Sequence, residues 1–205
     1  MNPKFERTEL FDHYHQNMNP FMIVTVPVDV TNVVNYCKIH KNFYATMGYL
    51  IMKAVNQIDA FKWRYENNEF HYYSSLVPSF TQKLGDNEIG YFDCEYNEDY
   101  DAFIAHFIEN QNDFYQQKSS TSLSPSSAIW FSCIPWFSIT SLVPPFDKNN
   151  TIPQFIWDKY EEKNGIYQVH LMILVHHGFA DGFHIAKFLE LLNEEIKNFQ
   201  KIEKL

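Results

Sequence analysis

The sequence predicts an α+β fold. Helical and strand-like segments follow one another without the regular strand–helix alternation that a doubly wound parallel sheet requires. Apolar residues make up 45% of the chain, which also holds 19 Phe and 13 Tyr, so there is enough apolar surface for a packed core. A chain of 205 residues fits one domain, and we expect residues 1–205 to form a single domain.

The first part of the chain predicts a strand, a helix and a hairpin. Phe21–Val28 is rich in β-branched and aromatic residues, which favours a strand. Over Tyr44–Ile58 apolar residues recur at intervals of three and four, which indicates an amphipathic helix. Phe61–Tyr65 and Phe70–Tyr73 flank two asparagines. Because asparagine tolerates positive φ, these two segments predict a tight β-hairpin.

The middle of the chain predicts a strand, a helix and a loop. Leu76–Gln82 has the composition of a strand, and Asp99–Gln116 carries apolar residues at near-helical intervals. Ser119–Ser127 is rich in serine, which is typical of a loop. This loop is the segment that we expect to be most mobile.

The last part of the chain predicts two apolar strand regions and a helix. Ala128–Ser141 is interrupted by Pro135, whose missing N–H predicts a bulge or a join between two strands. Tyr167–His176 has the pattern of a long buried strand. Over Phe183–Ile196 apolar residues recur at helical spacing, and Asp181 is placed to cap this helix.

Composition limits the classes of partner and the compartment. The formal net charge is −9, whereas binding to nucleic acid or an anionic membrane needs clustered Lys and Arg, so neither is expected as the main partner. The N-terminus lacks the apolar stretch of a signal peptide, so we expect a cytoplasmic protein. The three cysteines, Cys37, Cys94 and Cys133, are not spaced as metal ligands, so we expect reduced, buried thiols. The alternative is that Cys133 acts as a nucleophile.

The densest cluster of polar groups is HHGFADGFH, residues 176–184, where a predicted strand ends and a helix begins. The chain has no P-loop, GxGxxG, GxSxG or HExxH motif, so the chemistry is expected in this cluster. An imidazole with a pKa of about 6.5 accepts a proton from a hydroxyl at neutral pH, which predicts a general base at one of the two adjacent histidines.

Two alternatives apply to the same cluster. One is a core histidine that is bonded to the backbone, and the other is a metal site built from His176, His177, Asp181 and His184. Adjacent histidines in a strand point to opposite faces and do not easily share one ion, so catalysis is preferred to a metal site.

Residues 176–184 resemble the HHxxxDG signature of CoA-dependent acyltransferases, and the ending DGFH is similar to the chloramphenicol acetyltransferase family in particular. The family's fold is then expected, a mixed β-sheet with helices packed on one side. Further similar segments occur in the expected order along most of the chain: Phe5–Tyr14, Asn42–Arg64, Pro78–Thr81, Ile134–Ser141 and Lys159–Tyr160.

The resemblance implies direct transfer of an acetyl group from acetyl-CoA to an acceptor hydroxyl, with no acyl-enzyme and no metal. His177 would be the general base, and the hydroxyl of Ser141 would bond the oxyanion of the tetrahedral intermediate. Asp181 would pair with Arg7 and so hold the catalytic loop. The alternatives are an ordinary strand serine at 141, and an exposed Arg7 beside a simple helix-capping Asp181.

Binding roles and assembly follow from the same resemblance. Tyr160 and Lys159 would contact CoA, and Tyr14, Met22 and Ile156 would line the acceptor pocket. The family is a homotrimer with active sites between subunits. The expected partners are therefore CoA, a small-molecule hydroxyl acceptor and two further copies of the chain.

The resemblance is weaker in the acceptor pocket. His15–Met22 lacks the Pro-Cys-x-Phe pattern of chloramphenicol-binding members, and Ile156 stands where a threonine is expected. We expect chloramphenicol O-acetylation, with another small hydroxyl compound or xenobiotic as the alternative acceptor. A lipoyl acyltransferase would have a longer chain with a lipoyl domain, and a non-catalytic small-molecule-binding trimer would tolerate loss of His177.

Overall fold

The computed structural model describes residues 3–40, 42–86, 88–121 and 125–199. Within these ranges the chain forms helices and strands in the following order: α1 (Thr8–His15), β1 (Phe21–Asp29), α2 (Thr31–His40), α3 (Phe43–Val55), the 3-10 helix η1 (Asp59–Phe61), β2 (Trp63–Glu66), β3 (Glu69–Tyr72), β4 (Val77–Lys83), β5 (Ile89–Asp93), α4 (Tyr100–Gln117), β6 (Ala128–Ile134), β7 (Gln154–Asp158), β8 (Glu161–Lys163), β9 (Ile166–His176) and α5 (Gly182–Asn198).

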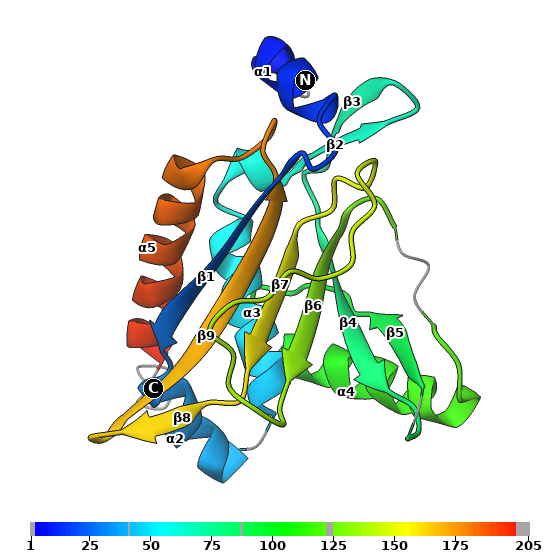
Figure 1. Cartoon of the computed structure of the whole chain (residues 1–205). Helices are drawn as coiled ribbons and strands as arrows, with labels where there is room; N and C mark the ends of the chain where they lie inside the picture. Colours follow the sequence, from blue (N-terminus) through cyan, green and yellow to red (C-terminus); the bar gives the residue numbers. More distant parts are fainter. Residues whose placement is uncertain (1–2, 41, 87, 122–124, 200–205) are drawn as a thin grey trace.

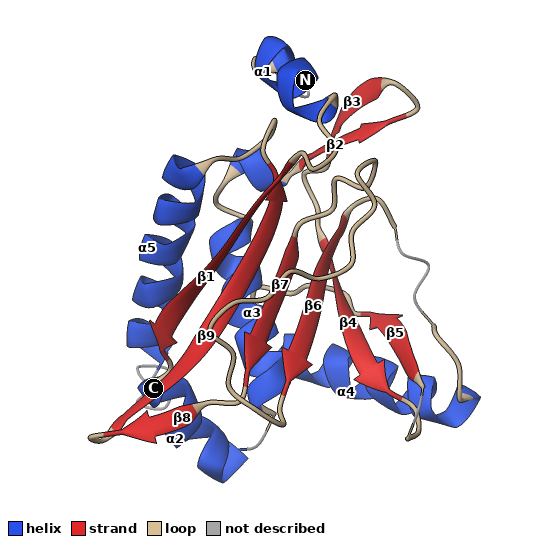
Figure 2. Cartoon of the chain, in the orientation of Figure 1, coloured by secondary structure: helices blue, strands red, loops and turns tan. Residues whose placement is uncertain are grey.

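Most of the strands form one mixed sheet in the order β1-β9-β7-β6-β4-β5, with β8 paired to β9. β6 is parallel to β4 and β7, whereas β9 is antiparallel to β1 and β7. Helices α3, α4 and α5 cover one face, and the segment between β6 and β7 crosses the other (Figure 1). Figure 2 shows the same division into a helical layer and a sheet. The predicted fold class, a mixed sheet with helices on one side, is confirmed.

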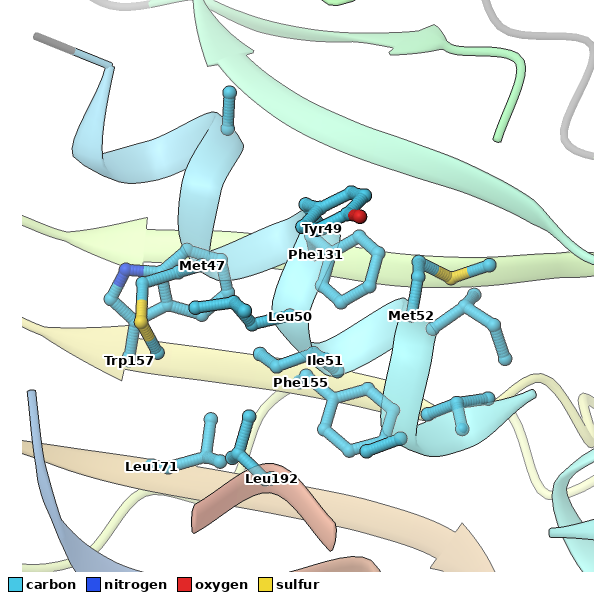
Figure 3. Packing of buried hydrophobic residues seen from close by; sticks show 14 of the residues in the cluster. Met47, Tyr49, Leu50, Ile51, Met52, Phe131, Phe155, Trp157, Leu171 and Leu192 are labelled. Atoms are coloured by element: carbon cyan, nitrogen blue, oxygen red, sulfur yellow. The ribbon is translucent and has the colours of Figure 1, made fainter. Parts of the chain in front are cut away.

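Helix α3 lies at the centre of the helical layer, and ten of its thirteen residues are buried. Leu50 and Ile51 lie among Phe155 and Leu171 of the sheet and Leu192 of α5 (Figure 3). The absence of a side chain at position 48 allows this close approach, because a Cβ there would lie 2.6 Å from the ring of Phe80 in β4. A glycine inside a helix is unfavourable by itself, and here it is explained by packing.

The alternation of side chains along β9 assigns each residue to one face of the sheet. Val169, Leu171, Ile173 and Val175 belong to the main core under the helices. The residues between them, which end with His176, therefore point to the opposite face. We call this opposite face, which carries no helix in the described chain, the open face.

A second apolar cluster lies beyond the end of β9, where α1 and the hairpin β2–β3 meet (Figure 1). Phe11 of α1, Trp63 of β2 and Phe179 are buried there, and Phe5 packs against all three, with ring centroids 5.0 to 6.4 Å away. Because Phe179 belongs to the loop between β9 and α5, this cluster braces that loop from the side of the N-terminus.

Most of the predicted elements are confirmed. Strands expected over Phe21–Val28, Leu76–Gln82 and Tyr167–His176 correspond to β1, β4 and β9, and the two helices expected in the middle and at the end correspond to α4 and α5. The two asparagines of the hairpin turn have positive φ, as predicted. The helix expected over Tyr44–Ile58 is α3, which already ends at Val55.

The prediction of a bulge or a second strand after Pro135 is wrong. β6 ends at Ile134, and residues 135–141 form a turn followed by irregular chain. Proline cannot donate to a sheet ladder, and the described chain does not resume the strand beyond it. Within the expected loop Ser119–Ser127, residues 122–124 lie outside the described residues.

Candidate functional site

The loop between β9 and α5, residues 177–181, is the centre of the candidate site. The N–H of His177 donates to the carbonyl of Pro20 at 2.8 Å, which ties the loop to the start of β1. The N–H groups of Phe179 and Ala180 both donate to the carbonyl of His176, at 2.9 and 3.1 Å. These bonds close a tight turn directly at the end of the strand.

Helix α1 packs on this turn. A Cβ at Gly178 would lie 2.7 Å from the Cα of Phe11, so only glycine allows the backbone of the loop to approach the helix this closely. One turn further along α1, the ring of Tyr14 stacks on the ring of His177, with centroids 4.0 Å apart and planes 15° apart. The helix therefore fixes both the backbone of the loop and the imidazole.

His177 is the accessible histidine of the adjacent pair. It is half-buried, whereas the other residues of 171–180 are buried. Its Nδ1 is buried and has no hydrogen-bond partner among the described residues. Because the residue is half-buried and Nδ1 is its buried ring nitrogen, the other ring nitrogen, Nε2, is the candidate proton acceptor.

His176 occupies a different environment. Its ring is 2% exposed and stacks on Phe11 with centroids 4.7 Å apart. Burial, together with the nearby charges of His15 and His177, lowers the pKa of His176 to about 3. Nδ1 accepts a hydrogen bond from the N–H of Gly178 at 3.1 Å, so His176 is a neutral core residue that supports the loop.

Arg7, Asp181 and His184 form a hydrogen-bonded group at the start of α5. Nη2 of Arg7 donates to Oδ2 of Asp181 at 2.9 Å, and Nη1 donates to the carbonyl of Phe179 at 2.8 Å. Oδ1 of Asp181 lies 2.8 Å from Nδ1 of His184 and accepts the N–H of Phe183 at 3.0 Å. The predicted contact between Arg7 and Asp181 is present, and Asp181 also caps α5 as expected.

The charge of Asp181 is favoured in this group. Burial raises the pKa of Asp181, but the hydrogen bond and charge of His184 and the charge of Arg7 outweigh it, so the pKa lies below its usual value. The side chains of Arg7 and Asp181 are 23% and 34% exposed. Removing one partner of a fully buried ion pair costs several kcal/mol of stability, but this pair is too exposed for that value to apply. An ion pair of this exposure contributes about 1 kcal/mol or less to the free energy of unfolding.

Ser141 is exposed and lies on the segment that crosses the open face. Two residues before it, the N–H of Ile139 donates to Asp158, which also accepts the N–H of His170 on β9. His170 lies on β9 seven residues before His177, which follows the end of the strand, or roughly 23 Å away at the usual rise of a strand. Among the described residues no hydrogen bond joins Ser141 and His177, and neither of them lines the pocket described below.

A pocket of about 430 Å³ opens on the same face between the sheet and the crossing segment. Ile156, an expected acceptor contact, lines this pocket, whereas His177 does not. Most of the wall is apolar or aromatic, and the lining residues are Ser79, Thr81, Ile89, Tyr91, Trp130, Phe131, Ser132, Pro144, Pro145, Gln154 and Ile156. A neutral, largely apolar molecule suits such a wall.

Met22 lies on the opposite face of the sheet from this pocket. It pairs with Val175 and packs against the main core on the helix-covered face of the sheet. Because successive residues of a strand point to opposite faces, Met22 does not line the pocket on the open face, and its role as an acceptor contact stays a prediction. Its neighbour Phe21 points to the open face, where its ring contacts Phe146 of the crossing segment with centroids 5.1 Å apart.

Tyr160 and Lys159 lie between β7 and β8, at the end of β9 away from His177. Tyr160 is 37% exposed, and its ring makes edge contacts with Phe43 of α3 and Tyr167 of β9 at 5.2 and 5.8 Å between centroids. Lys159 is exposed. Tyr160 and Lys159 thus follow one another as two exposed residues on one connection.

Three other observations bear on alternatives from the sequence. Burial, and secondarily the charge of Asp158, raises the pKa of Cys133 to about 12, so its thiolate is scarce at neutral pH and a nucleophilic role is disfavoured. Within the described ranges, no three His, Cys, Asp or Glu side chains are grouped to hold a metal ion. In the same ranges no helix is long and apolar enough to cross a lipid bilayer.

Several residues of the site were not predicted from the sequence. Tyr91 of β5 and Trp130 of β6 line the pocket. The pattern of apolar residues in these two strands does not by itself show which face of the sheet each side chain is on. Asp158 and His170 meet across β7 and β9. The resemblance includes the Lys-Tyr pair after Asp158, but no local pattern indicates that the aspartate is buried and bonded.

The family model described as "Chloramphenicol acetyltransferase" matches residues 2–193. Among curated relatives, a chloramphenicol acetyltransferase of Campylobacter coli is 28% identical over 194 residues, which cover 92% of each chain. Chloramphenicol acetyltransferase 3 of Escherichia coli is 28% identical over 198 residues, covering 92% of this chain and 91% of that protein.

Solved structures agree in fold. A chloramphenicol acetyltransferase superposes with a TM-score of 0.80 at 21% identity, covering 94% of this chain and 96% of that one. A probable dihydrolipoamide acetyltransferase from Listeria monocytogenes superposes with a TM-score of 0.71 at 13% identity, covering 97% and 94%. At such identities these structures show the fold alone.

Proposed function

The chain belongs to the chloramphenicol acetyltransferase family and is an acetyl-CoA-dependent O-acetyltransferase; from this premise we propose that it acetylates chloramphenicol, with His177 as the general base. The observation that supports the base most directly is the environment of His177. It is the half-exposed residue in a buried stretch, and its ring is held by Tyr14 and its backbone by Pro20.

The proposed reaction is a direct transfer. Nε2 of His177 takes the proton of the acceptor hydroxyl, and the oxygen attacks the thioester carbonyl of acetyl-CoA. The hydroxyl of Ser141 donates to the oxyanion that forms, an interaction worth on the order of 3 kcal/mol in comparable sites. Collapse of the intermediate breaks the carbon–sulfur bond, and the thiolate of CoA receives the proton from the imidazolium of His177.

Arg7 and Asp181 support the base without touching the reacting atoms. Arg7 binds both the carboxylate of Asp181 and the carbonyl of Phe179, so it connects the N-terminal segment to two points of the catalytic loop. An imidazole that is misplaced by about 1 Å loses much of its effect, so the role that we propose for this pair is to orient His177.

The open-face pocket is proposed as the acceptor site. Ile156 would be a residue of its wall, and Tyr14 would contact the acceptor next to the general base, His177. Its aromatic and apolar lining suits an aryl-bearing neutral alcohol. The methyl-bearing side chain of Ile156 supplies no hydroxyl for a polar contact with the acceptor. This observation favours, as the second candidate, a different small hydroxyl compound or xenobiotic as the natural acceptor.

The active site is proposed to lie between subunits of a homotrimer in the cytoplasm. The absence of His177 from the lining of the pocket supports a site that is completed by a second copy. Tyr160 and Lys159 would then contact CoA at the far end of the sheet from the base. Residues 1–205 are proposed to act as one domain.

The test is CoA release from acetyl-CoA, followed with a thiol reagent, with and without chloramphenicol. We expect chloramphenicol-dependent release by the wild type and a loss of at least about 1,000-fold in kcat for His177→Ala, since the base takes part in the transition state. His106→Ala, which removes a half-buried histidine of α4 on the helical side, is the matched control and should retain activity.

The outcomes separate the candidates. No release from the folded wild type with chloramphenicol, but release with another alcohol from a panel, would reject chloramphenicol and retain the enzyme and its base. Equal rates for wild type and His177→Ala would reject His177 as the base. Ligand binding without release by either protein would favour a non-catalytic binding trimer.

A further inference from the structure

A carboxylate–imidazole pair that has no role in the reaction described above lies on the open face. Asp158 is the last residue of β7, and its side chain has 0% exposure, whereas the side chain of His170 on β9 is 29% exposed. Oδ2 of Asp158 lies 2.9 Å from Nδ1 of His170, and Oδ1 accepts the backbone N–H of His170 at 2.7 Å. A carboxylate only accepts hydrogen bonds, so Nδ1 of His170 carries the hydrogen in this pair.

The same carboxylate holds the chain that follows β6. Oδ2 of Asp158 accepts the N–H of Ile139 at 2.8 Å and the hydroxyl of Ser138 at 3.1 Å. Residues 135–141 have no strand partner, so these two bonds replace the sheet ladder that would otherwise fix them. Asp158 therefore binds four donors, two of which lie on the segment that carries Ser141.

We propose that Asp158 is a positioning residue of the acetyl transfer, which fixes the segment that presents Ser141 while His170 holds the carboxylate in place. The inference rests on the oxyanion role proposed for Ser141. Ser141 is two residues beyond Ile139, so the anchor at Asp158 sets where its hydroxyl lies. An oxyanion donor acts within a window of about 0.4 Å in distance, so a small shift of the segment is enough to weaken it.

The test is a double-mutant cycle between Asp158→Asn and Ser141→Ala. Asparagine has the shape of aspartate, but its NH₂ group faces donors that need an acceptor. In the wild-type background we expect Asp158→Asn to lower kcat about 10- to 100-fold with both KM values changed less than about threefold. In the Ser141→Ala background we expect a further loss of less than about threefold, because the group that Asp158 positions is already absent.

Variants of His170 provide the rescue test. His170→Asn keeps an N–H donor at about the place of Nδ1 and should retain kcat within about threefold, whereas His170→Ala should lose about 5- to 20-fold. Asp59→Asn is the matched control, since it neutralises an exposed carboxylate of η1 that is outside the site, and it should leave kcat unchanged.

Three outcomes overturn the inference. One is a fold-loss of kcat from Asp158→Asn that is as large in the Ser141→Ala background as in the wild type. Such independence would indicate a general structural effect of Asp158→Asn. Another is full kcat in Ser141→Ala, which removes the oxyanion role itself. If the wild type turns over no acceptor, the proposed function fails, and amide hydrogen exchange of residues 135–141 decides: faster exchange in Asp158→Asn than in Asp59→Asn supports the anchor, and equal exchange overturns it.

Discussion

The two adjacent histidines at the end of β9 have opposite chemistry. His177 is half-exposed and stacks on Tyr14, whereas His176 is enclosed by Phe11 and the loop backbone. A neutral His176 adds no positive charge beside the imidazolium that forms on His177 during transfer. Local sequence predicts the pair and its loop, but which ring is buried depends on α1, which lies more than 150 residues away in the chain.

The low pKa of His176 predicts a loss of stability in acid. The unfolded state binds a proton near pH 6.5 and the folded state near pH 3, so the free energy of unfolding falls as the pH drops below about 6.5. Between pH 7 and pH 5 the loss from this one residue is about 2 kcal/mol.

Urea unfolding at these two pH values checks the prediction. The difference in unfolding free energy between pH 7 and pH 5 should be smaller by about 2 kcal/mol in His176→Gln than in the wild type. The matched control His106→Gln should keep the wild-type difference. Identical pH dependence in His176→Gln and the wild type would mean that protonation of His176 does not cause the loss of stability in acid.

The start of α5 combines a structural and a functional contact in one side chain. Asp181 caps the helix through the N–H groups of Phe183 and His184, and it separately binds Arg7. The capping bonds are local and follow from the Asp-Gly pattern, so they were predicted from sequence. The bond to Arg7 joins residues 174 positions apart and was expected only from the resemblance.

Two substitutions of Asp181 separate these contacts. Asp181→Asn keeps an oxygen acceptor for the cap and loses the charge that binds Arg7, whereas Asp181→Ala loses both. We expect Asp181→Ala to be less stable than Asp181→Asn by about 1 kcal/mol in urea unfolding.

In both variants kcat should fall by a similar factor, because the contact with Arg7 is lost in each. Arg7→Met serves as the reference, since it removes the same contact and leaves the cap. Equal stability of the two Asp181 variants would contradict the capping role. A full kcat in Asp181→Asn would contradict the role of the ion pair.

Long periodic segments were predictable, whereas most short segments without a turn signal, unlike the β2–β3 hairpin, were not. Helices α3, α4 and α5 have 13, 18 and 17 residues, enough to show a helical period. Strands β5 and β7 have five residues each and were missed, as was the ten-residue helix α2, which buries only Val33 and Val34. The segment after β6 was assigned wrongly, because its course is set by Asp158 and its partners in β9 and not by its own residues.

The open face has the character of an interface. Exposed apolar residues occur along the segment between β6 and β7 that crosses this face, including Trp136 at 68%, Phe137 at 58% and Val143 at 63%. Surfaces of this kind on a folded chain commonly mark contact with another protein. A neighbouring copy on this face would complete the site that we propose to lie between subunits.

Assembly and activity should therefore be lost together. The wild type is expected to sediment as a trimer of about 73 kDa, three times the chain mass of 24.4 kDa. Val143→Glu places a charge in the proposed interface, and at micromolar concentration it should shift the mass toward a single chain and lower kcat at least about tenfold, because burying an unpaired charge opposes association. Ile39→Glu, the same kind of change at a 75% exposed residue of α2, is the matched control and should remain trimeric and active. A fully active, monomeric wild type would place the whole site within one chain and reject the shared arrangement.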